Sequence, residues 1–349
     1  MTYCAGWKYN NSVYLLADTL ATKSTMPSSN HTSFGELHAE VRGDHVEESL
    51  LKLVPIGPGT AIAYSGDVQL ANHILNFLKD NLDNTTSIRD LLSLMETSMG
   101  PFNTEAVVAL LVATSNTNGD SELIQWSTKE GINTTKSDYY QIGSLTSYHA
   151  AFTPNILSYL AAGQLAPDRM LPVMTAIVQS YGIHDNLIDM NVGGLIFGLR
   201  TEQGRVIWQE DSNYFLYSRN LASVMFISAM ARDNALIVHS SLAEGITMFA
   251  HSVSMPPLSQ WDEAWRRQIE AELESDRFRY WIFISTEGKV ITLIIRNDLE
   301  QQSRLFRLAL KSKGLFDMAI KPELMSLLSQ PLQDTDDDGI PFRLNVRND

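Results

Sequence analysis

The chain has 349 residues, 44% of them apolar and 19% charged, so it is long enough for one large or two ordinary domains and is not a disordered chain. Its formal net charge of −14 disfavours nucleic acid and anionic membrane surfaces as partners, because both attract basic proteins. The one cysteine, Cys4, permits no intrachain disulfide, and neither a membrane-spanning apolar run nor a signal peptide is recognisable. The sequence therefore predicts an acidic cytoplasmic globular protein.

The N-terminal region reads as a strand, a turn and a second strand. Segments suited to β-structure at 2–7 and 13–17 flank the dipeptide Asn10-Asn11, which favours a tight hairpin turn. The polar stretch 23–46 has almost no apolar periodicity and is interpreted as a long loop or partly ordered insertion. The segment LLKLVPIGPGTAIAYSGD, residues 50–67, then predicts two strands joined by a Gly-Pro-Gly turn.

Helices are expected where apolar residues recur every three or four positions. Two such segments, 68–82 and 87–99, follow the paired strands, and Thr86 or Ser87 is the predicted N-cap of the second. The further elements predicted as far as residue 215 are strands at 106–114, 123–127 and 139–143, helices at 146–164 and 169–181, and a hairpin at 194–209. This order predicts an α+β protein in which helices cover antiparallel sheets.

Residues 216–330 are predicted to form a second α+β module. Its elements are strands at 224–230, 235–241 and 246–251, a helix at 261–274, a hairpin across Glu287-Gly288 and a closing helix at 299–311. Residues 331–349 are interpreted as an acidic solvated tail. Within it DTDDDG matches the first half of a calcium loop, but the twelfth position is Asn345 instead of glutamate, so no metal site is predicted.

Four stretches of the first 215 residues form a pattern when taken in chain order. TYCAG and LLADTLAT place Thr2 sixteen residues before Asp18, and LLKLVP contains Lys52. QIGS contains Ser144, and LIDMNVGG contains Asp189 before a Gly-Gly pair. This pattern resembles the proteasome β-subunits and the related bacterial threonine proteases, which are Ntn-hydrolases, over residues 2–210.

The resemblance implies a fold and an assembly. The fold would be a four-layer αββα Ntn-hydrolase sandwich at 1–215, with the insertion at 23–46, followed by the additional C-terminal module. Members of the family assemble into rings or stacked rings, so a homo-oligomer is implied. Three roles are open to the additional module. It could gate the chamber that such rings enclose, bind a partner ATPase, or cap the oligomer.

The resemblance also implies residue roles. Thr2 would be the nucleophile, exposed by removal of Met1, while Asp18 and Lys52 would form its supporting ion pair. Ser144 and Asp189 would complete the set of catalytic residues. The oxyanion N–H would come from Gly66, in the turn Ser65-Gly66-Asp67. The family's chemistry calls for no cofactor and no metal.

The chemistry of an N-terminal threonine can be argued from elementary principles. A threonine hydroxyl is a poor nucleophile until a base takes its proton. A free α-amino group, whose ordinary pKa is near 8, can be that base. A neighbouring lysine favours the neutral amine by like-charge repulsion, and an aspartate holds the lysine in place. The predicted function is therefore a threonine-type endopeptidase or amidohydrolase that acts on peptides or proteins.

Two features depart from the family's pattern. The interval between Thr2 and Lys52 is lengthened by the insertion, which costs little because the entropy of loop closure grows slowly with loop length. Val192 stands where the family has a serine that supports the nucleophile. This second departure leaves open an alternative function, a non-catalytic scaffold or partner-binding subunit with the same fold.

The candidate residues also have ordinary structural interpretations. Lys52 alone is typical of a solvated strand lysine, and Asp18 alone of a turn. Ser144 is equally suited to cap a helix that begins at Thr146. Cys4, two residues from Thr2 on the same strand face, is interpreted as a buried structural thiol.

Overall fold

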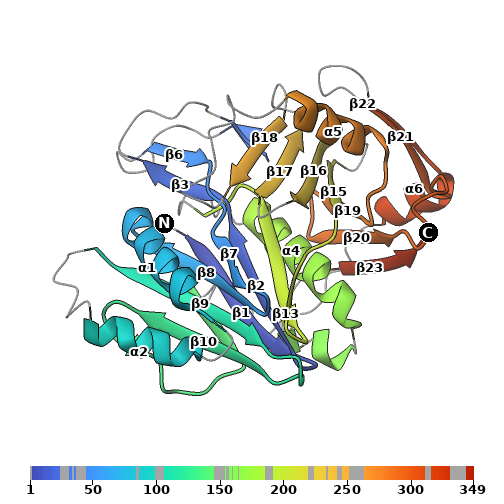
Figure 1. Ribbon diagram of the computed structural model, residues 1–349. Helices are drawn as coiled ribbons and strands as arrows, with labels where there is room; N and C mark the ends of the chain where they lie inside the picture. The colour runs from blue at the N-terminus through green and yellow to red at the C-terminus, as the bar shows by residue number, and fades with distance from the viewer. Residues whose placement is uncertain are drawn as a thin grey trace.

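Two five-stranded antiparallel sheets lie within residues 3–208 of the chain (Figure 1). The computed structural model describes residues 2–23, 31–33, 35–36, 45–83, 86–98, 106–144, 154, 157–158, 160–163, 165–184, 192–218, 224–232, 235–241, 246–250, 263–310, 316–330 and 343–349. The first sheet has the order β12-β1-β2-β13-β14, with strands Tyr139–Gly143, Tyr3–Tyr9, Ser12–Asp18, Ile196–Glu202 and Arg205–Trp208. The second has the order β11-β10-β9-β8-β7, with strands Gly131–Ile132, Ser121–Ser127, Val108–Ser115, Thr60–Gly66 and Leu53–Gly57.

The N-terminal hairpin forms as its sequence predicts. Strands β1 and β2 pair in antiparallel register from Cys4 opposite Ala17 to Tyr9 opposite Ser12. Asn10 and Asn11, between them, have φ angles of 48° and 63°. Asparagine tolerates this left-handed conformation better than most residues, which is why an Asn pair favours the two-residue turn.

The two sheets pack face to face, and helices cover the outer face of each. Helices α1 (Val68–Asn81) and α2 (Ile88–Ser98) lie on the second sheet, where Ile74 and Leu92 pack against Ile62 and Trp126. Ser87 Oγ accepts the backbone N–H of Asp90 at 3.1 Å, which confirms the predicted cap of α2. Helix α4 (Pro167–His184) lies on the free face of the first sheet, against β13 and β2.

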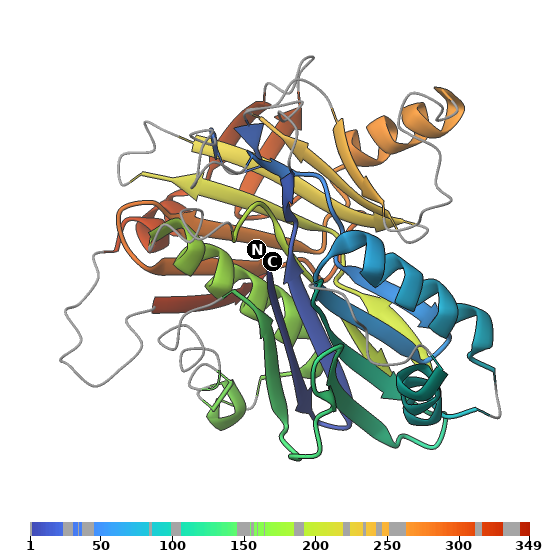
Figure 2. The same ribbon diagram turned by 90° about the vertical axis from the view of Figure 1, so that its left-hand side faces the viewer.

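A seven-stranded sheet lies on the other side of α4 (Figure 2). Its order is β18-β17-β16-β15-β19-β20-β23, with strands Ile246–Ala250, Ala235–Ser240, Val224–Arg232, Ser212–Tyr217, Tyr280–Ser285, Val290–Ile295 and Arg343–Asn348. Every residue of α4 from Met170 to Tyr181 is buried, because the first sheet covers one side and β19 and β20 cover the other. The helix therefore belongs to two layers at once.

The outer face of the seven-stranded sheet carries a third core. Helices α5 (Glu263–Glu274) and α6 (Pro322–Leu328) pack there through Ile269, Leu273, Leu324 and Leu328. The hairpin of β21 (Phe306–Leu310) and β22 (Phe316–Ile320) lies beside them, and Phe306 reaches Trp281 with ring centroids 4.1 Å apart.

The observed elements confirm the mixed α+β class but correct one element. The helix predicted at 299–311 is wrong, because residues 306–310 form β21, paired in antiparallel register with β22. Phe306, Leu308 and Leu310 alternate with Arg307 and Ala309, and this period of two suits the hairpin. The helix predicted at 146–164 falls largely outside the described residues.

Two further segments contain β-strands that their polar composition did not predict. Within 20–48 the described residues form short strands, β3 (Leu20–Lys23), β4 (His31–Thr32), β5 (Gly35–Glu36) and β6 (His45–Glu48). Residues 343–348, in the segment interpreted as an acidic tail, form β23 in parallel register with β20. The division at residue 215 falls inside β15, and the domain boundary stays a prediction.

The described residues contain neither a membrane-spanning helix nor a metal-binding group of side chains. None of the helices seen in them combines the length and the apolar character that crossing a lipid bilayer demands. Nor do they contain a group of three or more His, Cys, Asp or Glu side chains placed to hold a metal ion.

Two buried serines on neighbouring strands allow a test of how this sheet treats hydroxyl groups. Ser228, in β16, is fully buried, and its Oγ has no hydrogen-bond partner within the described structure. Ser212, in β15 and equally buried, donates to Glu210 O at 2.8 Å and accepts from Gln209 Nε2 at 3.1 Å. We expect Ser212→Ala to lower the free energy of unfolding by about 1 kcal/mol, and Ser228→Ala to leave it unchanged or raise it by up to about 1 kcal/mol. Urea denaturation at constant m-value measures both changes. Equal losses of stability in the two variants would contradict the difference in hydrogen bonding between Ser212 and Ser228.

Candidate active site

Asp18 is the centre of the candidate site. The residue ends β2 opposite the start of β1, and its side chain is 0% exposed. Its Oδ1 accepts the backbone N–H of Tyr3 at 3.0 Å and lies 2.6 Å from Lys52 Nζ. Its Oδ2 accepts the backbone N–H of Gly193 at 3.2 Å. One carboxylate thus joins the N-terminal strand, the lysine and the Gly-Gly turn.

Lys52 owes its position to the start of the second sheet. It immediately precedes β7, and its carbonyl accepts the backbone N–H of Tyr64, in β8, at 3.2 Å. The lysine is 2% exposed, so the interpretation of a solvated strand lysine is wrong. Removing two charges from water is costly, and the short contact to Asp18 offsets that cost. The ion pair connects the two sheets, since Asp18 belongs to the first and Lys52 adjoins the second.

Thr2 immediately precedes β1 and Tyr3, whose N–H binds Asp18. It is 7% exposed, and its carbonyl accepts the backbone N–H of Ser144 at 2.9 Å. Gly143, at the end of β12, has φ of 113°, and a Cβ atom there would lie 1.8 Å from Thr2 O. Only glycine allows this conformation and this approach. The Gly-Ser turn therefore contacts the main chain of Thr2, and the role of the Ser144 side chain stays a prediction.

The other predicted site residues have no described contact with Thr2 or lie outside the described residues. Gly66 ends β8 and is exposed; the contacts of the described residues do not join it directly to Thr2. Asp67, beside it, caps α1 by accepting the backbone N–H of Leu70 at 2.8 Å. Asp189 lies outside the described residues, as does Thr146, where the helix that Ser144 would cap is predicted to begin. Val192 is fully buried.

Cys4 is a buried thiol next to the site. Its Sγ donates to the carbonyl of Tyr64 at 3.3 Å. Burial raises the pKa of the Cys4 thiol, and the positive charge of Lys52 opposes this only in part. A thiol kept protonated is a weak nucleophile, which agrees with the structural role expected from sequence.

Sequence reasoning missed a polar network around the Gly-Gly turn. Glu48, at the end of β6, is 8% exposed, and its Oε1 accepts from Thr19 Oγ1 at 2.7 Å and from the N–H of Leu195 at 2.8 Å. Gln179, in α4, donates from Nε2 to Gly194 O at 3.0 Å. The position of Glu48 at the end of a polar stretch gave no sign that its side chain would be buried.

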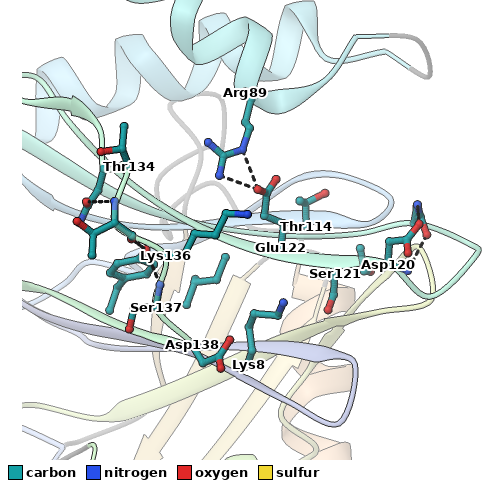
Figure 3. A pocket seen from close by; sticks show the side chains of 16 residues that line it. Lys8, Arg89, Thr114, Asp120, Ser121, Glu122, Thr134, Lys136, Ser137 and Asp138 are labelled. Atoms are coloured by element: carbon teal, nitrogen blue, oxygen red, sulfur yellow. Dashed lines mark hydrogen bonds and ion pairs between the residues drawn. The ribbon is translucent and has the colours of Figure 1, made fainter.

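A pocket of about 840 Å³ lies elsewhere (Figure 3). Its walls include Lys8, Arg89, Glu122 and Asp138, with Arg89 Nη2 2.6 Å from Glu122 Oε1. Lys8 is near the end of β1, roughly 15–20 Å along the strand from Tyr3. The pocket has charges of both signs, and Thr2, Asp18 and Lys52 are not among the residues that line it. It is therefore separate from the candidate active site.

Comparison with known proteins adds no family. No family model matches the sequence. No curated protein matches it significantly either.

Proposed function

We propose that this chain is a threonine-type peptidase or amidohydrolase whose nucleophile is Thr2, exposed by removal of Met1. The observation that carries the proposal is the buried Asp18 carboxylate, which binds both the Tyr3 backbone and the Lys52 ammonium. A buried lysine paired with the carboxylate that binds the N–H of Tyr3 suits a site in which the chain's own amine is the base. We further propose that the two five-stranded sheets and their covering helices form an αββα Ntn-hydrolase sandwich.

The proposed reaction begins at the freed amine of Thr2. The amine takes the proton of Thr2 Oγ, and Oγ attacks the carbonyl carbon of a peptide or amide. The resulting oxyanion receives a hydrogen bond from the N–H of Gly66. The proton passes to the leaving amine, the C–N bond breaks, and an ester to Thr2 remains. Water, deprotonated by the same amine, hydrolyses that ester and restores the site.

The other residues act through position and charge in this proposal. Lys52 disfavours a protonated amine beside it, and Asp18 holds Lys52 in place. Ser144 and Asp189 support the amine. The substrates would be peptides or proteins in the cytoplasm, and the active form would be a homo-oligomeric ring, with a partner ATPase as one candidate ligand of the C-terminal module.

Val192 favours a second candidate function. Its buried apolar side chain offers no hydroxyl to orient the amine, so the chain could retain the fold as a non-catalytic scaffold or partner-binding subunit. The two functions differ in one measurable property, the reactivity of Thr2.

Intact-mass measurement tests the proposal. We expect the purified protein to lack Met1 and to gain one adduct with a β-lactone or epoxyketone. Thr2→Ala should abolish the adduct, whereas Thr2→Ser should keep it, because both small residues permit removal of Met1 but only serine retains a hydroxyl. A protein that keeps Met1 and forms no adduct would support the scaffold, and hydrolysis unaltered in Thr2→Ala would defeat the enzyme assignment.

A further inference from the structure

We propose that Glu48 is a positioning residue of this site, and that its carboxylate anchors the turn 192–195 through which Asp18 is oriented. The inference rests on the proposed function, since a site must be reactive for positioning to matter. It assigns a role to the end of the insertion, a part of the chain that no motif singled out.

The contacts of Glu48 account for both of its carboxylate oxygens. Oε1 accepts from Thr19 Oγ1 at 2.7 Å and from the Leu195 N–H at 2.8 Å, while Oε2 accepts the backbone N–H of Ser33 at 2.5 Å. No cation of the described chain pairs with this carboxylate. A buried charge held by neutral donors alone interacts strongly with each of them, so the three donors are fixed relative to one another.

The turn fits closely over this carboxylate. Gly194 has φ of 67°, and a Cβ atom there would lie 2.6 Å from Thr19 Oγ1 and 2.8 Å from Glu48 Cδ. No other residue could bring the backbone so near. The side chain of Val192 contributes no polar contact, so the turn is attached through its backbone groups.

The same turn contacts Asp18. The N–H of Gly193 donates to Asp18 Oδ2 at 3.2 Å, and its carbonyl accepts the N–H of Thr19 at 3.3 Å. Glu48 therefore holds residue 195 in place together with Thr19 Oγ1, which also accepts the Leu195 N–H at 2.9 Å and is itself bonded to Glu48. Residue 193 in turn holds the carboxylate that binds Lys52. A displacement of the turn would rotate Asp18 and move the lysine away from the Thr2 end of β1.

The second oxygen of Glu48 links the site to the seven-stranded sheet. Ser33 is buried, and its carbonyl accepts a hydrogen bond from Ser240 Oγ, at the end of β17, at 3.1 Å. Ser33 thus lies between the C-terminal module and Glu48. A hydrogen-bonded connection runs from Ser240 to Asp18 through Ser33, Glu48 and the turn.

Kinetics of covalent labelling can separate positioning from folding. The variants are Glu48→Leu, which removes both acceptors at similar volume, and Glu48→Gln, which keeps an acceptor for Leu195 but opposes Ser33 with an NH₂ group. Glu122→Gln, at a half-exposed carboxylate paired with Arg89, is the matched control. Labelling by a β-lactone, followed by intact mass, yields kinact and KI, and hydrogen exchange reports the protection of the 192–195 amides.

We expect Glu48→Leu to lower kinact roughly 10- to 100-fold with KI unchanged, because small misplacements of reacting groups have effects of that size. Exchange at 192–195 should accelerate in the same variant. Glu48→Gln should show an intermediate loss of kinact, and Glu122→Gln none.

The outcomes distinguish the two levels of inference. Wild-type kinact in a folded Glu48→Leu variant would overturn the role of Glu48 and leave the peptidase proposal intact. If Glu48→Leu does not fold, Glu48→Gln decides in its place, since a wild-type kinact there would overturn the role equally. A wild-type protein that is never labelled would defeat both, even if the 192–195 amides depend on Glu48.

Discussion

Lys52→Met is expected to lower the free energy of unfolding by about 3 kcal/mol and to abolish labelling of Thr2 by a β-lactone. Methionine fills a similar volume but leaves the Asp18 carboxylate buried without its counter-charge, and removing one partner of a buried ion pair is strongly destabilising. The carboxylate would keep only the N–H groups of Tyr3 and Gly193. Denaturant unfolding and intact mass measure the two effects.

The double variant Asp18→Asn/Lys52→Met separates stability from reactivity. A neutral amide in place of the carboxylate removes the uncompensated charge, so we expect much of the lost stability to return. Labelling should stay absent, because no ammonium group lies beside the amine of Thr2. Lys8→Met, an exposed lysine near the other end of β1, controls for the loss of a positive charge. Normal labelling of Lys52→Met would refute the assigned role of the lysine.

Gly143→Ala is expected to destabilise the protein and to reduce the reactivity of Thr2 together. Alanine at φ of 113° is strained, at a cost of about 1–3 kcal/mol, and its Cβ would also meet Thr2 O at 1.8 Å. The main chain at residue 2 must move to relieve that contact. A large loss in labelling rate should therefore accompany the loss of stability.

Gly119→Ala is the matched control for the expected loss of Thr2 reactivity in Gly143→Ala. Gly119 also has a positive φ, 89°, but a Cβ atom there would meet nothing within 4 Å. It tests backbone strain alone, so we expect a smaller loss of thermal stability and an unchanged labelling rate. Similar behaviour of the two alanine variants would show that the approach of Gly143 to Thr2 has no consequence for the site.

Helix α4 connects the first five-stranded sheet with the seven-stranded sheet. Its Gln179 binds the Gly-Gly turn, while Thr175 Oγ1 lies 3.4 Å from Tyr214 OH in the seven-stranded sheet. The helix and the Ser33–Glu48 contact are thus two separate connections from the seven-stranded sheet to the vicinity of Asp18. Both pass through the turn 192–195.

Local signals in the sequence determined much of the secondary structure, whereas the candidate residues were proposed from the order of four short motifs. Three features could be predicted because each depends on neighbours within a few positions. They are the Asn10-Asn11 turn, the amphipathic pattern of α1 and α2, and the aspartate at the end of an apolar strand. The same locality explains the error at 299–311, where a short apolar pattern fits a helix or a strand until β22 supplies the partner.

Tertiary structure alone decided which of these residues meet. The ion pair of Asp18 with Lys52 spans 34 positions, and the contact of Glu48 with Leu195 spans 147. Burial of α4 on both sides and the parallel addition of β23 likewise depend on distant strands. A hydrogen bond or a contact ion pair needs its atoms within about 3 Å in space, whatever their separation along the chain. Periodicity and motif could therefore locate the candidates, whereas only the folded chain could bring them into contact.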